Sequence, residues 1–113
     1  MADQCLFCKI VRREIPATVV AETPDCLAFR DVNPQAPLHV LVVPKEHVAS
    51  LNETKDALMI GRLAVLAAEI AEREHVAAAG YRTVINTNAD AGQTVFHIHL
   101  HLRGGRPMTW PPG

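Results

Sequence analysis

The stretch that decides the fold is Val95-Phe96-His97-Ile98-His99-Leu100-His101-Leu102-Arg103, in which three histidines alternate with apolar residues. Successive side chains of a β-strand point to opposite faces of the sheet. A strand over 95–103 therefore directs one set of side chains into a core and the other onto the opposite face: Phe96, Ile98, Leu100 and Leu102 against His97, His99 and His101. An imidazole titrates near neutrality and can offer a ring nitrogen as nucleophile, base or metal ligand. The pattern predicts a strand and a reactive surface together.

The composition is that of one folded domain. The chain has 113 residues, of which 49% are hydrophobic and 20% charged, and its formal net charge is −1. Such a chain is long enough to bury a core, and its dispersed basic residues do not form the electrostatic footprint of a nucleic-acid-binding protein. We expect a single domain over 1–113 with an irregular tail at 104–113, where three prolines oppose regular structure.

The sequence also sets expectations about compartment and cysteine chemistry. No basic segment followed by an apolar run opens the chain, and the most apolar stretch, 57–71, is interrupted by Gly61, Arg62 and Glu69. We therefore expect a cytoplasmic protein with no membrane partner. In that compartment three cysteines do not indicate a disulfide framework. Cys5 and Cys8 form a C-x-x-C pair typical of metal or redox sites, and Cys26 is expected to be a small core residue.

Local patterns predict an α+β fold with one short and one long helix. The short helix is expected at 5–12 and the long one at 56–74, where Met59, Leu63, Leu66 and Ile70 form one apolar stripe. Strands are expected at 18–22, 26–29, 39–43, 81–87 and 95–103. The first two should form a hairpin, and the continuously apolar third should be central. These elements predict a five-stranded, mainly antiparallel sheet.

A metal site made from the three alternating histidines alone is a poor fit. Residues two apart on a strand are about 6.6 Å apart at Cα, which suits a single tetrahedral ion badly. One of these histidines joined to ligands elsewhere in the chain is the better metal hypothesis.

His97-Ile98-His99-Leu100-His101-Leu102 resembles the His-φ-His-φ-His-φ-φ signature of the histidine triad superfamily, where φ is apolar. Further residues, in the right order along the chain, resemble its Hint branch: the loop from Asp31 to Pro37, His39 with Val42 to Lys45, Asn86 with the turn from Asp90 to Gln93, and the end from Trp110 to Gly113. The chain departs from the pattern at two positions. Arg103 replaces the last φ, and Thr94 stands where many Hint proteins have serine.

The resemblance implies a purine nucleoside 5′-monophosphoramidase that cleaves a P–N bond through a covalent nucleotidyl-histidine and requires no cofactor for the chemistry. By this resemblance His99 is the nucleophile, whose second ring nitrogen needs an acceptor such as a backbone carbonyl. His101 would bond the phosphoryl or bridging atom, and Thr94 would assist the leaving amine. His39 and Asn86 would hold the polar network, and the backbone amides of Gln93, Thr94 and Val95 would receive phosphate oxygens.

For the nucleoside, the resemblance implies an apolar wall at Phe29 and Val32 and a ribose-binding carboxylate at Asp31. Some members of the superfamily bind zinc through such a C-x-x-C pair and two histidines, one of which is the first of the triad. Carried over, the expected zinc ligands are Cys5, Cys8, His47 and His97, an S₂N₂ set suited to tetrahedral Zn²⁺.

Two other functions stay open on the sequence: hydrolysis of dinucleoside polyphosphates by the same nucleophile, and a non-catalytic role as a nucleotide-binding regulator. The resemblance also implies a homodimer in which the sheet continues across a two-fold axis. The long helix and the strand at 81–87 are the expected contributors to that interface.

Overall fold

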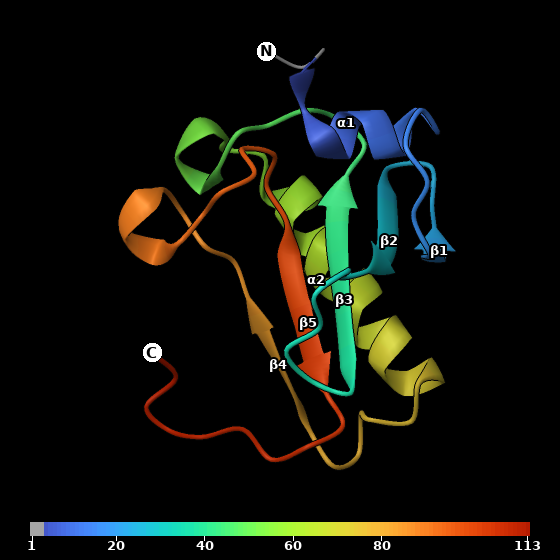
Figure 1. Cartoon of the computed structure of the whole chain (residues 1–113), viewed down its shortest axis with the longest axis vertical. Coiled ribbons are helices and arrows are strands. Elements are labelled where there is room, and N and C mark those ends of the chain that lie inside the picture. The colour runs from blue at the N-terminus through green and yellow to red at the C-terminus, as the bar shows by residue number, and fades with distance from the viewer. Residues whose placement is uncertain (1–3) are drawn as a thin grey trace.

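In the computed structural model, which describes residues 4–113, five strands form one open antiparallel sheet in the order β1-β2-β3-β5-β4 (Figure 1). The strands are β1 (Val19–Glu22), β2 (Cys26–Arg30), β3 (Leu38–Pro44), β4 (Tyr81–Val84) and β5 (Leu100–Gly104). Two α-helices accompany them, α1 (Leu6–Val11) and α2 (Ala57–Arg73). The described part of the chain is therefore α+β, with the short and long helices and the hairpin at the expected places.

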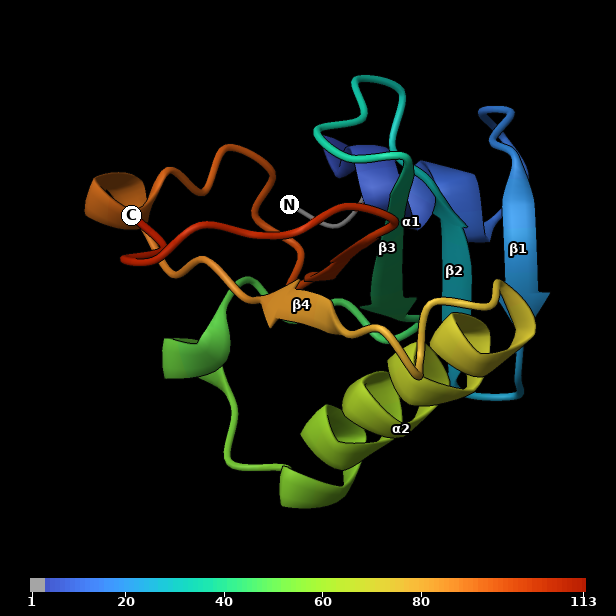
Figure 2. The same ribbon diagram turned by 90° about the horizontal axis from the view of Figure 1, so that it is seen from below.

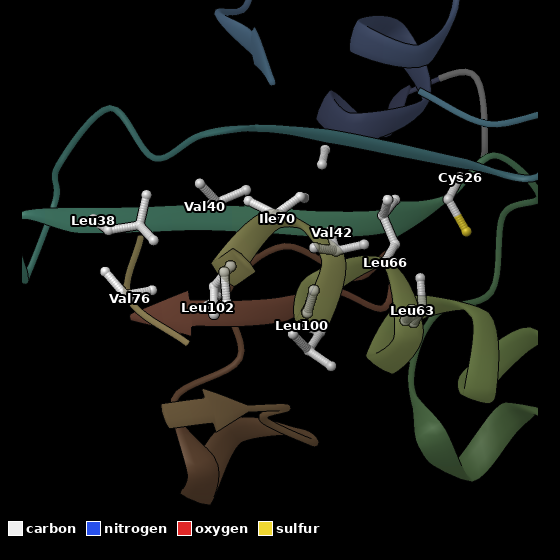
Figure 3. Close-up of a cluster of buried hydrophobic side chains, with 13 residues drawn as sticks. Cys26, Leu38, Val40, Val42, Leu63, Leu66, Ile70, Val76, Leu100 and Leu102 are labelled. Atoms are coloured by element: carbon white, nitrogen blue, oxygen red, sulfur yellow. The ribbon is translucent and has the colours of Figure 1, made fainter. Parts of the chain in front are cut away.

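Helix α2 covers one face of the sheet (Figure 2). The Asp56 side chain caps its start by accepting a hydrogen bond from the amide of Met59, 3.0 Å away. The expected stripe is buried along its whole length, and Leu63, Leu66 and Ile70 face the even-numbered residues of β3 and β5, among them Val40, Val42, Leu100 and Leu102 (Figure 3). Cys26 belongs to this core, as predicted.

Helix α1 covers part of the opposite face. Phe7 and Ile10 from α1 pack with Leu27 and Phe29 of β2 and with Leu41 of β3 in a second buried cluster. Because both faces of the sheet are covered there, every residue of β3 is buried, which explains its continuous apolar sequence. The odd-numbered residues of β3 and β5, including His39 and His101, lie on the α1 face.

The histidine strand is shorter than predicted. β5 begins only at Leu100, so His97 and His99 lie in an irregular segment, with bends at 95–97, that precedes the strand. The β3–β5 pairing runs as far as Val42 with Leu100. Two positions further along this register, Pro44 would face Ile98, and proline has no N–H to donate. Ile98 instead donates its amide to the carbonyl of Val48, 2.7 Å away.

This early end of the ladder corrects one core assignment. Ile98, Leu100 and Leu102 are buried as expected, but the side chain of Phe96 is 48% exposed. β4 is also shorter than predicted, since it ends at Val84 rather than Thr87.

The tail after Gly104 follows an irregular path and is attached to the sheet by a hydrogen bond from the Arg82 guanidinium to the carbonyl of Thr109, 3.0 Å away. Over residues 4–113, no helix has both the length and the apolar character needed to cross a bilayer.

Candidate active site

The imidazole of His99 is held by its own backbone neighbourhood. Its Nδ1 donates a hydrogen bond to the carbonyl oxygen of His97 at 2.8 Å, which is the kind of acceptor the sequence analysis required. With the proton on Nδ1, the other nitrogen, Nε2, keeps a lone pair. Burial lowers the pKa of His99 from its ordinary value, although the bond to His97 works in the opposite direction. The neutral, nucleophilic form is therefore favoured at pH 7.

His39 and His101 are joined by a directional chain of hydrogen bonds. The amide of Gln35 can only donate, and it lies 3.0 Å from Nδ1 of His39, so this nitrogen accepts. A neutral His39 then carries its proton on Nε2 and donates it to Nδ1 of His101, 2.9 Å away. By the same reasoning His101 carries its own proton on Nε2. The chain leaves His101 with an N–H donor, the group needed to bond a phosphoryl oxygen.

His101 is strongly biased toward its neutral form. Burial, followed by the nearby His99, His39 and Arg103, lowers the pKa of His101 to about 4. Burial also lowers the pKa of His39, which is 3% exposed. Neither imidazole carries a charge at neutral pH, which agrees with the single proton shared between their facing nitrogens.

A pocket of about 270 Å³ lies beside these histidines. Its lining combines the polar side chains of His99, His101 and Thr94 with the apolar side chain of Phe29 and apolar residues of α1. The predicted residues that line it are Phe29, Asp31, Val32, Thr94, Val95, His99 and His101. A ligand that combines an apolar ring with an anionic group fits this mixed lining.

Phe7 is a lining residue that the sequence analysis did not select. Its ring meets the ring of His99 edge-on, with centroids 5.0 Å apart and an interplanar angle of 90°, and it also packs against Phe29 at 5.4 Å. The sequence showed Phe7 only as one apolar residue of a short amphipathic helix. No local pattern indicates that this helix folds over the histidines.

Three predicted site residues are placed differently from the rest. The amide of Gln93 donates to the carbonyl of Asn88, 3.1 Å away, so it is engaged within the loop here, and its contact with phosphate stays a prediction. The buried Gln93 side chain instead clamps the loop, with its amide nitrogen 2.7 Å from the carbonyl of Ala49. Asn86 is half-buried and does not line this pocket. Val32 lies at the pocket rim and is 99% exposed.

The remaining phosphate-binding candidates keep their donors. Among the described residues, the amides of Thr94 and Val95 have no backbone acceptor. Both residues line the pocket beside His99. They are therefore the backbone donors available to an anion there.

The fold also brings together the four residues expected to hold a metal ion. One ligand atom from each of Cys5, Cys8, His47 and His97 lies within 4.8 Å of the others. Nδ1 of His97 is 3.4 Å from the sulfurs of both Cys5 and Cys8, and Nδ1 of His47 is 3.2 Å from the sulfur of Cys8. The sulfur and nitrogen ligands of a tetrahedral zinc ion are about 3.5 Å apart, given ordinary Zn–S and Zn–N lengths.

The orientation of His97 also suits metal binding. Its Nε2 lies 2.7 Å from the carbonyl oxygen of Pro44, which fixes the proton on Nε2 and leaves the Nδ1 lone pair facing the sulfurs. A metal-bound histidine commonly donates its second ring N–H to a backbone carbonyl in this way.

Comparison with known proteins gives one consistent result. The family model for the HIT domain matches residues 12–108. Over 110 residues the chain is 46% identical to the purine nucleoside phosphoramidase of Escherichia coli, with 96% of this chain and 92% of the relative covered. A HIT-like protein of Synechococcus elongatus is 51% identical over 115 residues, and the match covers both chains completely.

The solved structures agree with this result. A HIT family hydrolase from Legionella pneumophila superimposes with a TM-score of 0.95 at 52% identity, covering 97% of this chain and 100% of the other. A histidine triad nucleotide-binding protein from Candida albicans superimposes with a TM-score of 0.82 at 30% identity, covering 96% of this chain and 83% of its own.

Proposed function

Since the chain belongs to the HIT domain family, we propose that it is a purine nucleoside 5′-monophosphoramidase, a hydrolase of the P–N bond between a nucleoside monophosphate and an amine. The observation that carries the proposal is the bond from His99 to the carbonyl of His97, because it leaves Nε2 as a nucleophile in a pocket with phosphate donors. The similarity to the phosphoramidase of Escherichia coli supports the same substrate class.

In the proposed reaction, Nε2 of His99 attacks the α-phosphorus while the P–N bond to the amine breaks. The departing nitrogen takes up one proton, for which the Thr94 hydroxyl and the Nε2–H of His101 are the available donors. Water then attacks the phosphorus, breaks its bond to His99 and restores that proton. The products are the amine and the nucleoside monophosphate, and His99 is regenerated.

The residues around His99 have matching roles in this proposal. His101 and the amides of Thr94 and Val95 bond the phosphoryl oxygens, whose charge develops during attack. Phe29 and Phe7 supply the apolar surface for the base, and Asp31 accepts the ribose hydroxyls. His39 keeps His101 in the required tautomer through their 2.9 Å contact. Gln93 acts through the loop it holds, and Asn86 is proposed to support the polar network of the site together with His39.

A direct comparison of substrates tests the function. An adenosine phosphoramidate and diadenosine triphosphate should be offered separately to the purified protein, and release of adenosine monophosphate followed. We expect the phosphoramidate to be hydrolysed at least about a hundredfold faster in kcat/KM, a difference of about 3 kcal/mol in transition-state binding. Preference for the triphosphate would instead indicate a dinucleoside polyphosphate hydrolase, and tight nucleotide binding without turnover would indicate a regulator.

We further propose that Cys5, Cys8, His47 and His97 hold a structural zinc ion. The support is the S₂N₂ donor set within 4.8 Å and the bond that orients His97. Metal analysis of protein purified without chelator or nickel resin should find about one zinc per chain. Cys8→Ser should lose the metal and Cys26→Ser, altered in the other core, should retain it. Well-folded wild-type protein without zinc would refute this site.

A homodimer with a continuous sheet is the third part of the proposal. β4 is an outer strand of the sheet, so its outer edge is open for pairing. On α2 the side chains of Leu58 and Val65 are 62% and 59% exposed. Sedimentation at micromolar concentration should give twice the chain mass, and a monomer at that concentration would contradict the dimer.

A further inference from the structure

Arg103 stands at the signature position where an apolar residue is expected, and its side chain reaches the histidines. It is the direct cross-strand partner of His39 in the β3–β5 ladder, and paired residues project from the same face of a sheet. Its Nε lies 3.4 Å from Nε2 of His39. This departure from the signature therefore places a permanent cation beside the hydrogen-bonded histidine pair.

Three groups surround Nε2 of His39: Nδ1 of His101 at 2.9 Å, Oδ2 of Asp31 at 3.4 Å and Nε of Arg103 at 3.4 Å. The facing nitrogens of His39 and His101 share one proton. A second proton would set two N–H groups against each other at that distance and break the bond. The hydrogen bond between His39 and His101 therefore requires a single proton between their facing nitrogens. The neighbouring charges determine the pH range over which this protonation state persists.

We propose that Arg103 is a positioning residue of the site: its fixed positive charge opposes a second proton on the His39–His101 pair and so keeps His101 a neutral Nε2–H donor toward the substrate phosphate. The consequence for turnover rests on the proposed phosphoramidase function. The effect on the two imidazoles is a property of the protein alone and can be tested without substrate.

Other charged groups near His39 and His101 also influence whether this pair takes up a second proton. Asp31, in the loop after β2, favours protonation of both histidines, whereas Arg103 disfavours it. His99 lies on the other side of His101, with ring centroids 5.0 Å apart. Arg106 is turned to the carbonyl of Gln35, and α1 presents the uncharged Phe7. Burial lowers both pKa values further, so Arg103 acts in the same direction as burial and against Asp31.

Arg82 provides a matched control. It is the cross-strand partner of Arg103 on β4, but its guanidinium donates to the carbonyl of Thr109 in the tail. Arg82→Leu removes the same charge from the next strand without removing a contact to His39. Arg103→Lys keeps the charge, whereas Arg103→Leu restores the apolar residue of the signature.

The first experiment is an NMR titration of the imidazole nitrogens in the ligand-free protein. We expect both His39 and His101 to carry their proton on Nε2 at pH 7 in wild type. In Arg103→Leu the apparent pKa of the pair should rise by about one unit, as expected for losing a cation a few ångströms away. Arg103→Lys and Arg82→Leu should each shift it by less than half of that. An unshifted pair in Arg103→Leu, or an equal shift in Arg82→Leu, overturns the proposal.

The second experiment is the pH profile of kcat for an adenosine phosphoramidate with the same variants. The acid limb of Arg103→Leu should move to higher pH by the amount seen by NMR, with little change in kcat at pH 8, and Arg103→Lys should restore the wild-type limb. If Arg103→Leu turns over the substrate normally and the acid limb of its kcat profile coincides with that of wild type, the proposed role of Arg103 is overturned. If the apparent pKa of the pair rises in Arg103→Leu but wild type hydrolyses no phosphoramidate, the charge effect is supported and the proposed function is refuted.

Discussion

The Nδ1–H of His99 is bonded to the carbonyl oxygen of His97, while the imidazole of His97 lies against the sulfurs of Cys5 and Cys8. One residue thus serves the pocket through its backbone and the cysteine cluster through its side chain. The two histidines differ only by position in the alternation, yet their rings belong to different sites.

Replacing His99 by alanine should abolish turnover while nucleotide binding survives. The variant removes the only atom proposed to bond phosphorus, so we expect kcat to fall on the order of 10⁴-fold or more. Affinity for adenosine monophosphate should change by no more than about tenfold, since one contact among many is lost. Steady-state kinetics and calorimetric titration measure the two effects. His75→Ala, on the surface beyond α2, is the control, and near-wild-type turnover in His99→Ala would refute the nucleophile.

Replacing His97 by alanine should lower stability and zinc binding much more than it lowers kcat. The carbonyl that orients His99 remains, so kcat should fall far less than in His99→Ala. The fully buried imidazole and its bond to Pro44 are lost, so the free energy of unfolding should drop by about 3 kcal/mol or more, and bound zinc should be lost with it. Urea unfolding, metal analysis and kcat together test this. Equal losses of kcat in the two variants would contradict the division of roles.

Phe7→Leu should lower activity more than stability. A buried Phe to Leu change keeps most of the apolar volume and costs about 1.5 kcal/mol or less, but it removes the flat ring edge packed on His99. We expect kcat to fall about tenfold through looser placement of the imidazole. Urea unfolding and kinetics decide the matter, with Lys9→Ala on the same helix as control. Unchanged kcat in a stable Phe7→Leu protein would show that the contact does not orient His99.

Stability should decline in acid because the half-buried His101 is held in its neutral form. Its folded pKa is about 4, whereas an unfolded histidine titrates near 6.5. As the pH falls between these values the unfolded chain binds the proton first, so the free energy of unfolding decreases by up to about 1.4 kcal/mol per pH unit. The free energy of unfolding, measured by urea unfolding at a series of pH values, should fall less steeply in His101→Asn than in wild type over this range. Between pH 7 and 8 the two curves should run parallel. If the two curves stay parallel down to pH 4.5, burial of neutral His101 does not cause the loss of stability.

Much of the architecture could be predicted from the sequence because apolar residues recur with the period of the helix or strand that they belong to. The stripe through Leu63 and Ile70 fixes the buried side of α2, and the alternation through Leu100 and Leu102 fixes the two faces of β5. Such patterns depend only on local geometry. They were sufficient to predict the number of α-helices and strands and their order along the chain.

The length of the histidine strand could not be read from the same pattern. Alternation continues through His97 and Ile98, but the ladder ends at Leu100, and its register places Pro44, which has no N–H, opposite Ile98. Sequence alone gives no register between strands distant in the chain, so the missing donor could not be matched to Ile98. For the same reason the bond from Gln35 to His39, which sets the tautomers, was not anticipated.

Phe7 and Gln93 show a second limit. Each was visible in the sequence, but its role depends on which segment it meets after folding. Phe7 reaches His99 because α1 folds across the sheet, and Gln93 bonds to Ala49, a loop residue far away in the chain. The resemblance to the histidine triad superfamily supplied chemistry for matching residues only, and neither contact belongs to its signature.

Asp31 offers the sharpest test of nucleoside recognition. One of its oxygens accepts the amide of Asn33 at 2.8 Å and the other lies 3.4 Å from His39, so the carboxylate is fixed before any ribose binds. If it also accepts the 2′-hydroxyl, wild type should prefer an adenosine phosphoramidate to its 2′-deoxy analogue by about tenfold or more in kcat/KM, the value of one hydrogen bond to a charged acceptor. Asp31→Ala should reduce that ratio to about one. Phe29→Leu should lower kcat/KM for both substrates equally and leave the ratio unchanged, because the contact proposed for Phe29 is with the base rather than with the sugar. If Asp31→Ala keeps the full preference for ribose, the carboxylate acts only on the loop and on His39.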